Sequence, residues 1–199
     1  MVNKPFLTSK FRALAVLAAL ATVGLFASPA FPAAAVSAKT PARPALSGAA
    51  MTSAVAFSGQ YSGKASLLID NSTVTISSIS GSGKNSLFGA SKASGNGSAP
   101  KGSSSLCDPF GGKGSITGGA NKITFVVIKS GSQQGCSSGE SGAVTITFHG
   151  VAKASGGSGK GNGATGSLKF KGTLHLGGTS GTQSGNFTVS LSGKLTVKS

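Results

Sequence analysis

Apolar and polar residues alternate with a period of two from about position 55 to the C-terminus. In the run 187–198, Phe, Val and Leu alternate with Ser, Thr and Lys. Successive side chains of a strand point to opposite faces, so this run predicts a half-buried β-strand. The same alternation predicts further strands at 61–70, 73–80, 84–90, 114–118, 144–152 and 168–176.

One predicted strand is apolar on both faces. In the run 122–129, one face has Ile123, Phe125 and Val127 and the other has Val126 and Ile128, which favours a central position or a covering loop. No window shows a 3.6-residue period over a useful length, so the predicted fold class is all-β. Clusters of Gly, Ser and Asn divide the strands at 131–142, 155–166 and 177–185, and the longest loop is predicted over 91–112.

A glycine motif recurs inside the predicted strands. An apolar or aromatic residue is followed two positions later by Gly and four positions later by another apolar residue, beginning at Tyr61, Phe148, Phe170 and Leu191. Glycine weakens a strand interior, but glycine kinks let the strands of a small closed barrel bend, and an aromatic ring can cover the gap. The pattern predicts a small antiparallel β-barrel of about eight strands. A general drift of composition toward Gly and Ser is the alternative.

The last two strands allow a specific register to be predicted. A turn centred near Gly181 that pairs Lys169 with Lys194 would place Phe170 opposite Gly193. Each inward glycine would then face a large side chain, while two ammonium groups would lie opposite one another on the outer face.

The N-terminus has the organisation of a signal peptide. Lys4, Lys10 and Arg12 form a positive segment, and the apolar run 13–27 follows it. Small residues suited to cleavage come next, so we predict a signal peptide over residues 1–38.

Cleavage after Ala38 fits the small-residue pattern best, with sites after Ala30 and Ala35 as rivals. An uncleaved anchor is the alternative, but Pro29 and Pro32 interrupt the apolar run before the roughly 20 residues that a spanning helix needs. We therefore expect a secreted, extracellular protein with no transmembrane segment in the mature chain.

Two further segments follow the predicted signal peptide. Residues 39–54 are mostly Ala, Pro, Ser and Thr, a composition that predicts a flexible linker. The barrel domain is predicted to occupy residues 55–199.

Composition adds a strong charge imbalance. The 199 residues contain 18 Lys and Arg, 3 Asp and Glu, and 32 Gly, with a formal net charge of +15. Removal of Lys4, Lys10 and Arg12 with the signal peptide lowers this to about +12. The scarcity of carboxylates disfavours most acid–base enzymes, and the positive excess favours an anionic partner.

The two cysteines predict one disulfide. An even count in an exported domain indicates pairing, so Cys107 and Cys136 should be bonded. A catalytic thiol would need activation by His149 or His175, and both lie among Thr and Lys on predicted strands. These residues lack metal-ligand spacing, so no catalytic, metal-binding or cofactor-binding residue is predicted.

A resemblance appears in the C-terminal third. The segment 156–168, followed by Phe170-Lys-Gly172 and Gly193-Lys-Leu195, resembles the GGTGxFxxAxG segment of the allene oxide cyclase and dirigent barrels and of similar small exported bacterial proteins. The resemblance implies an eight-stranded antiparallel barrel with a central cavity, and its departure is Gly161, where the family usually has Phe. The family's plant enzymes use cavity carboxylates, and Asp70, Asp108 and Glu140 match none of them.

Three function classes follow from these observations. The first is a non-enzymatic exported barrel, structural or holding a small hydrophobic ligand against an inner face that includes Tyr61, Phe148, Phe170 and Phe187. The second is a cationic surface protein that binds extracellular polyanions nonspecifically, with candidate anion-binding residues Lys169, Lys171, Lys194 and Lys198. The third is a cyclase or isomerase of the type that the resemblance implies. Specific nucleic-acid recognition is not expected, because the lysine-bearing faces lack aromatic residues.

Overall fold

The computed structural model describes residues 51–101, 106–138 and 142–198, and these ranges form almost continuous β-structure. The strands are β1 (Thr52–Ile69), β2 (Thr73–Asn85), β3 (Gly89–Pro100), β4 (Cys107–Pro109), β5 (Gly111–Gly118), β6 (Asn121–Val127), β7 (Gln134–Ser138), β8 (Val144–Ser158), β9 (Thr165–Leu176) and β10 (Gly181–Lys198). A single 3-10 turn, η1 (Gly159–Gly161), is the only helical element among the described residues. The predicted signal peptide lies outside them.

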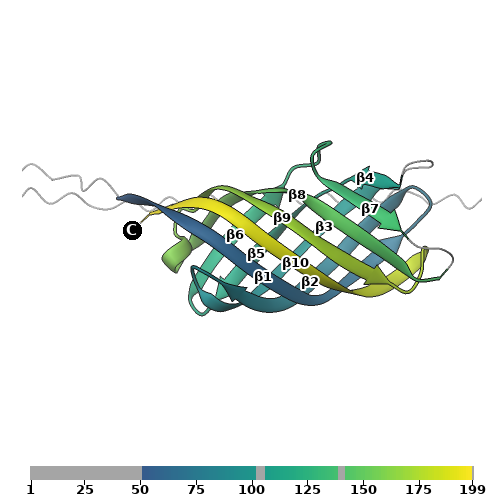
Figure 1. Ribbon diagram of the computed structural model, residues 1–199, viewed down its shortest axis with the longest axis horizontal. Helices are drawn as coiled ribbons and strands as arrows, with labels where there is room; N and C mark the ends of the chain where they lie inside the picture. The colour runs from purple at the N-terminus through teal and green to yellow at the C-terminus, as the bar shows by residue number, and fades with distance from the viewer. Residues whose placement is uncertain (1–50, 102–105, 139–141, 199) are drawn as a thin grey trace, which may run out of the picture. The chain divides into compact units, whose positions relative to one another are not determined.

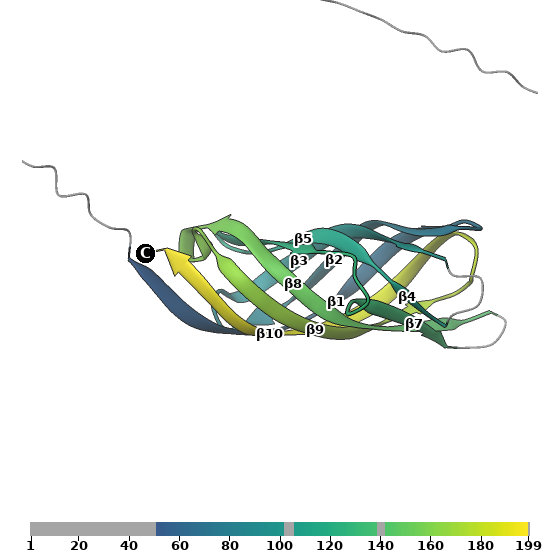
Figure 2. The same cartoon turned by 90° about the horizontal axis from the view of Figure 1, so that it is seen from above.

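Eight of these strands close into an antiparallel barrel. The ring runs β1, β2, β3, β5, β6, β8, β9 and β10, and the pairing of β10 with β1 and of β8 with β9 completes it. The strands cross the barrel obliquely (Figure 1; Figure 2). The predicted fold class, an antiparallel barrel of about eight strands, is confirmed. Within the described ranges, no helix has the length and apolar character needed to cross a membrane.

The two remaining strands extend one hairpin beyond the ring. The β5–β6 ladder ends with Gly112 opposite Val127, and the β4–β7 ladder resumes with Pro109 opposite Gln134. Between them, the segment 128–133 is inserted on one side of the hairpin. β4 and β7 therefore project at the end of the barrel where the β1–β2 and β9–β10 turns also lie, which we call the open end.

The inward aromatic residues of the eight ring strands each lie opposite a glycine on a neighbouring strand. The cross-strand pairs are Phe57–Gly193, Tyr61–Gly83, Phe187–Gly63, Phe125–Gly114, Phe148–Gly172 and Phe170–Gly150. A ring can lie flat across such a position because no side chain opposes it. The repeated glycines were predicted to let the wall bend while aromatic rings cover the gaps. The aromatic–glycine pairs place a ring over each of these glycines.

Gly172 shows how close the approach is. A Cβ atom at this position would collide with the carbonyl oxygen of Thr188 and would lie 2.6 Å from Cζ of Phe148. No alanine fits there without a shift of the backbone or of the ring.

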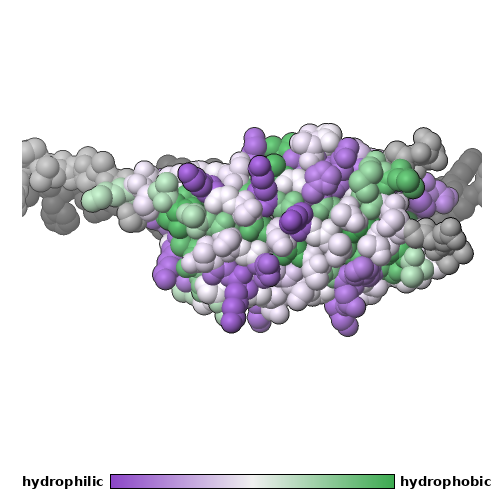
Figure 3. Space-filling view, in the orientation of Figure 1, coloured by the Kyte–Doolittle hydropathy of each residue, from purple (hydrophilic) through white to green (hydrophobic). Residues whose placement is uncertain are grey.

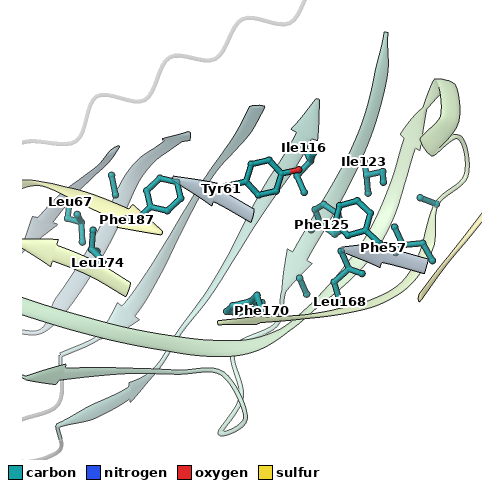
Figure 4. Packing of buried hydrophobic residues seen from close by; sticks show 14 of the residues in the cluster. Phe57, Tyr61, Leu67, Ile116, Ile123, Phe125, Leu168, Phe170, Leu174 and Phe187 are labelled. Carbon is teal, nitrogen blue, oxygen red and sulfur yellow. The ribbon is translucent and has the colours of Figure 1, made fainter. Parts of the chain in front are cut away.

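The end of the barrel opposite the open end is filled by side chains. Phe57, Ile123, Leu168 and Leu195 are buried there (Figure 4). The close packing of large apolar side chains leaves this end without space for a ligand. We call it the packed end.

A polar cluster beside the packed end has all its hydrogen bonds made internally. Asn85 Nδ2 donates to the hydroxyl oxygen of Tyr61 at 2.9 Å and to that of Ser91 at 2.8 Å. Asn85 Oδ1 accepts from the backbone N–H groups of Leu87 and Phe88, at 2.9 and 2.7 Å. The cluster thus fixes the β2–β3 turn, and among the described residues no buried side-chain polar atom lacks a partner.

Three segment assignments made from the sequence are wrong. The loop cluster predicted over 131–142 contains β7 (Gln134–Ser138). The predicted strand 84–90 contains the β2–β3 turn, because Asn85 folds back onto the turn backbone. The predicted loop 91–112 contains β3, whose inward residues are small: Ala93, Gly95, Gly97 and Ala99. Small residues carry little hydropathic contrast, so alternation is not visible in this strand.

The linker and the apolar run also need correction. β1 begins at Thr52, so the predicted linker 39–54 extends three residues too far into the domain. The run 122–129 was expected to be covered on both faces, yet Val126 is 40% exposed and Ile128 is 54% exposed. The outward face of this run is therefore not covered by another part of the described chain to the degree that a core is.

The β9–β10 register differs from the predicted one by two residues. Lys169 lies opposite Ser192, Lys194 lies opposite Ser167, and Phe170 lies opposite Leu191. The shift keeps every inward residue inward, because the side-chain period of a strand is two. It also removes the predicted direct opposition of two lysines.

We expect Gly172→Ala to lower the free energy of unfolding by about 2 kcal/mol or more, because the added methyl group overpacks the contact with Phe148. Gly177→Ala is the matched control, since a Cβ at Gly177 meets nothing within 4 Å. Urea unfolding of both variants measures the difference. Equal stability of the two would contradict the close approach.

Candidate ligand cavity

The open half of the barrel encloses a cavity of about 380 Å³. Its lining is mainly aliphatic and aromatic, and includes Val74, Ile76, Ile146, Phe148 and Val189. These inward side chains are only partly buried, unlike those of the packed end. The part of these side chains that is not buried faces the cavity.

Small residues on two adjacent strands create this space. The inward positions of β3 are Ala93, Gly95, Gly97 and Ala99, and β5 adds Gly112 and Gly114. Larger side chains on the opposite wall do not reach far enough to fill the gap. The cavity is thus a consequence of missing side-chain volume on one wall.

Three phenylalanines form one side of the cavity. Phe110 lies with its ring centroid 6.5 Å from that of Phe148 and 5.9 Å from that of Phe170. The rings of Phe148 and Phe170 are 6.4 Å apart. These separations fall in the range of favourable tilted and edge-on contacts, so the three rings form a stable apolar surface.

Gln133 closes the wall beside these rings. β8 pairs with β6 as far as Lys153 and with β7 from His149, which leaves an interval between the two ladders. Gln133 is 6% exposed there, and its Nε2 donates to the carbonyl oxygen of Val151 at 3.5 Å. Its Oε1 accepts from the hydroxyl groups of Ser130 and Ser132.

Charged groups of the lining lie away from the apolar interior. Lys101 directly follows β3, and Asp108 belongs to β4; both lie at the open end. Lys113 is exposed on the outer face of β5. Asp70, in the β1–β2 turn, accepts backbone hydrogen bonds from Ser72 at 2.9 Å and Thr73 at 2.6 Å. These bonds, with a smaller contribution from the charge of Lys101, hold the pKa of Asp70 below its ordinary value.

The remaining candidate groups lie outside the cavity. His149 and His175 are exposed on the outer face, where His175 Nδ1 lies 3.0 Å from Thr145 Oγ1. The described residues contain no group of His, Cys, Asp and Glu side chains arranged to hold a metal ion. Glu140 lies outside the described residues.

The predicted disulfide is confirmed. Cys107 and Cys136 lie directly opposite one another on β4 and β7 and are bonded, 29 residues apart in sequence. The bond holds the short strand β4 against β7 beside the cavity. This stabilisation is local to a part of the sheet that has few core contacts of its own.

The four candidate anion-binding lysines are only partly brought together. Lys169 and Lys171 follow one another on the outer face of β9, and Lys194 lies on the outer face of β10. Lys198 is separate, at the packed end, where its side chain lies over Gly163 and its N–H donates to the carbonyl oxygen of Asn162 at 2.8 Å. Lys153 of β8, which the charge pattern of the sequence also places among the C-terminal lysines, lies opposite Ser167 of β9 and so comes close to Lys169.

No protein-family model, curated protein or solved structure matches the chain.

The cavity residues on β3 are those that sequence reasoning missed. The alternation of Ala93, Gly95, Gly97 and Ala99 with Ser, Asn and Lys is a period-two pattern of small against polar residues. Counting alanine and glycine as inward positions in a chain with so much glycine would have found both the strand and the space beside it.

We expect reduction of the disulfide to lower the melting temperature by several degrees, because closing a loop of this length contributes about 3–4 kcal/mol in the chain-entropy account. Differential scanning calorimetry with and without reductant measures the shift. A Cys107→Ser, Cys136→Ser double variant should melt at the lower temperature under both conditions. A wild-type protein indifferent to reductant would argue against a stabilising bond.

Proposed function

We propose that the chain is exported and that its barrel holds a small apolar molecule in the open half. The observation that carries this proposal is the partly solvent-exposed apolar cavity of about 380 Å³ beside a fully packed half. A purely structural barrel of this size gains stability by filling its interior. An unfilled apolar space of this volume falls in the range of small-molecule pockets, about 300–1,000 Å³.

The lining favours a ligand with an apolar body. Phe110, Phe148 and Phe170 supply aromatic surface, and the small residues of β3 leave room opposite them. Burial of apolar ligand surface in this space is favourable by roughly 25 cal/mol per Å². Lys101 and Asp108 lie at the open end, so a polar group of the ligand would be placed there.

Binding is a better proposal than catalysis for this cavity. The buried polar cluster of Tyr61, Asn85 and Ser91 does not line the cavity, and its groups already bond to one another. A catalytic pocket needs polar groups that converge on one reacting atom. A cyclase-like or isomerase-like activity, which the family resemblance implies, has no such convergence to support it.

The export part of the proposal rests on two independent sequence features. The first 38 residues have the organisation of a signal peptide. The Cys107–Cys136 bond suits an oxidising compartment, because disulfides persist outside the cytosol.

We expect the uncharged fluorophore N-phenyl-1-naphthylamine to bind saturably, with a blue-shifted emission, because its aromatic body fits an apolar cavity of this kind. Ala93→Phe should abolish the signal, since Ala93 lines the cavity and a phenyl ring there would occupy it. Fluorescence titration measures both.

Ala56→Phe is the matched control, because Ala56 is exposed on the outer face of β1. It should bind the fluorophore as the wild type does. Melting curves of both variants separate lost binding from lost folding. A folded Ala93→Phe variant that binds like the wild type would refute the cavity as the ligand site.

Export predicts a particular mature chain. Intact-mass spectrometry of the protein recovered from the culture medium should give a chain that begins at Lys39 and is lighter by two hydrogens, from the bond between Cys107 and Cys136. A chain that retains residues 1–38 and stays with the cells would contradict secretion.

A further inference from the structure

The outer surface of β8, β9 and β10 carries mostly Lys, Ser and Thr side chains, with His149 and the apolar Val151 among them on β8. Its outward residues run from Thr147 to Lys153 on β8, from Ser167 to Thr173 on β9 and from Thr188 to Lys194 on β10. We call it the basic face. The three strands contain no Asp or Glu, so nothing on them neutralises the lysines.

Strand pairing brings four lysines of the basic face into one neighbourhood. Ser167 of β9 lies opposite Lys153 on one side and opposite Lys194 on the other. Lys169, two residues along β9, is therefore a diagonal neighbour of both. Lys171 follows at a rise of about 6.6 Å, with His149 directly opposite on β8.

A row of hydroxyl groups lies beside these cations. Thr147, Thr173 and Thr188 are direct cross-strand neighbours on β8, β9 and β10, and Ser62 of β1 lies opposite Thr188. Thr173 Oγ1 and Thr188 Oγ1 are 3.0 Å apart and hydrogen bonded. The row is thus part of a rigid sheet, at the usual strand spacing of about 4.8 Å.

The aromatic residues of the same strands point the other way. Phe148, Phe170 and Phe187 are turned into the barrel opposite glycines. The basic face consequently presents no Phe, Tyr or Trp ring of the kind that single-stranded nucleic acid binding uses for base stacking, and His149 is the one imidazole on it. Figure 3 shows strongly hydrophilic side chains standing out from a paler surface that also has hydrophobic patches. The lysines of the basic face occupy separate outward positions on the three strands.

From this placement we propose that the basic face binds an acidic polysaccharide. Ammonium groups that are spaced along the face match a polymer that carries one anion on every sugar unit or on every few units. The hydroxyl row can exchange hydrogen bonds with the sugar hydroxyls. The site is separate from the cavity, because its side chains point outward from the same strands. It would allow a secreted barrel to stay on an anionic extracellular polymer while the cavity is loaded or empty.

The test is binding of the full chain to immobilised polygalacturonate across a salt series. Affinity should fall steeply with added salt, because bound cations are released when lysines neutralise a polyanion. A Lys169→Gln, Lys194→Gln double variant should bind about fivefold more weakly, since each lost surface ion pair is worth roughly two- to threefold.

Lys84→Gln, Lys92→Gln is the matched control. These exposed lysines of β2 and β3 are also diagonal neighbours, because Lys84 lies opposite Ala90, two residues from Lys92. The net charge of the two double variants is the same, and the control should stay within about twofold of the wild type.

Thr173→Val, Thr188→Val tests the hydroxyl row without changing charge. This variant should weaken binding to polygalacturonate but leave the salt dependence unchanged. Neutral dextran should not bind.

Equal losses for the two lysine variants would overturn the proposal in favour of a general effect of net charge. Tighter binding of single-stranded DNA than of polygalacturonate would overturn the assigned partner class. Absence of salt-sensitive binding to polygalacturonate would overturn the site itself. The Ala93→Phe variant should bind the polymer normally, so failure of the cavity proposal and failure of this one are distinguishable.

Discussion

The close approach of neighbouring strands, with a glycine opposite each inward aromatic ring, is the constraint on which the rest of this barrel depends. In an eight-stranded barrel the interior has room for little more than one layer of side chains. A phenylalanine on every strand would overfill it, and the pairs Phe148–Gly172, Phe170–Gly150 and Phe187–Gly63 avoid this by alternating large and absent side chains across the wall. The conformational cost of strand glycines is offset by the burial of the rings.

The volume of the inward side chains differs along the barrel and divides it into two halves. At the packed end, Phe57, Ile123, Leu168 and Leu195 meet and exclude solvent. Toward the open end, β3 and β5 supply the small residues Gly95, Gly97, Ala99, Gly112 and Gly114 to the lining, and the cavity lies beside them. The disulfide and Gln133 complete the wall where the hairpin of β5 and β6 is interrupted. A packed half is thereby combined with an unfilled apolar space in the same barrel.

The composition of the outer face is a consequence of what the interior takes. Because the interior takes the aromatic and aliphatic residues, the outward positions are left to Ser, Thr, Asn and Lys, with few carboxylates anywhere in the chain. The resulting surface is a rigid lattice of hydroxyl and ammonium groups. Whether two lysines act together on this lattice depends on the strand register, which places Lys169 beside both Lys153 and Lys194 but leaves Lys198 at the far end.

The sequence by itself determined the all-β class, the closed-barrel interpretation of the glycine motif and the pairing of Cys107 with Cys136. Each rests on a local or compositional signal: period-two alternation for the class, glycine placement for the barrel and a cysteine count of two for the disulfide. Only the tertiary structure decided the β9–β10 register, since a shift of two residues leaves every side chain on its own face and so leaves the pattern unchanged. It also decided that residues 89–100 form a strand, because Ala and Gly are recognised as inward only when a neighbouring strand pairs with them. The cavity was beyond sequence reasoning for the same reason: an unfilled volume is the difference between the space that eight strands enclose and the side chains that both walls contribute to it.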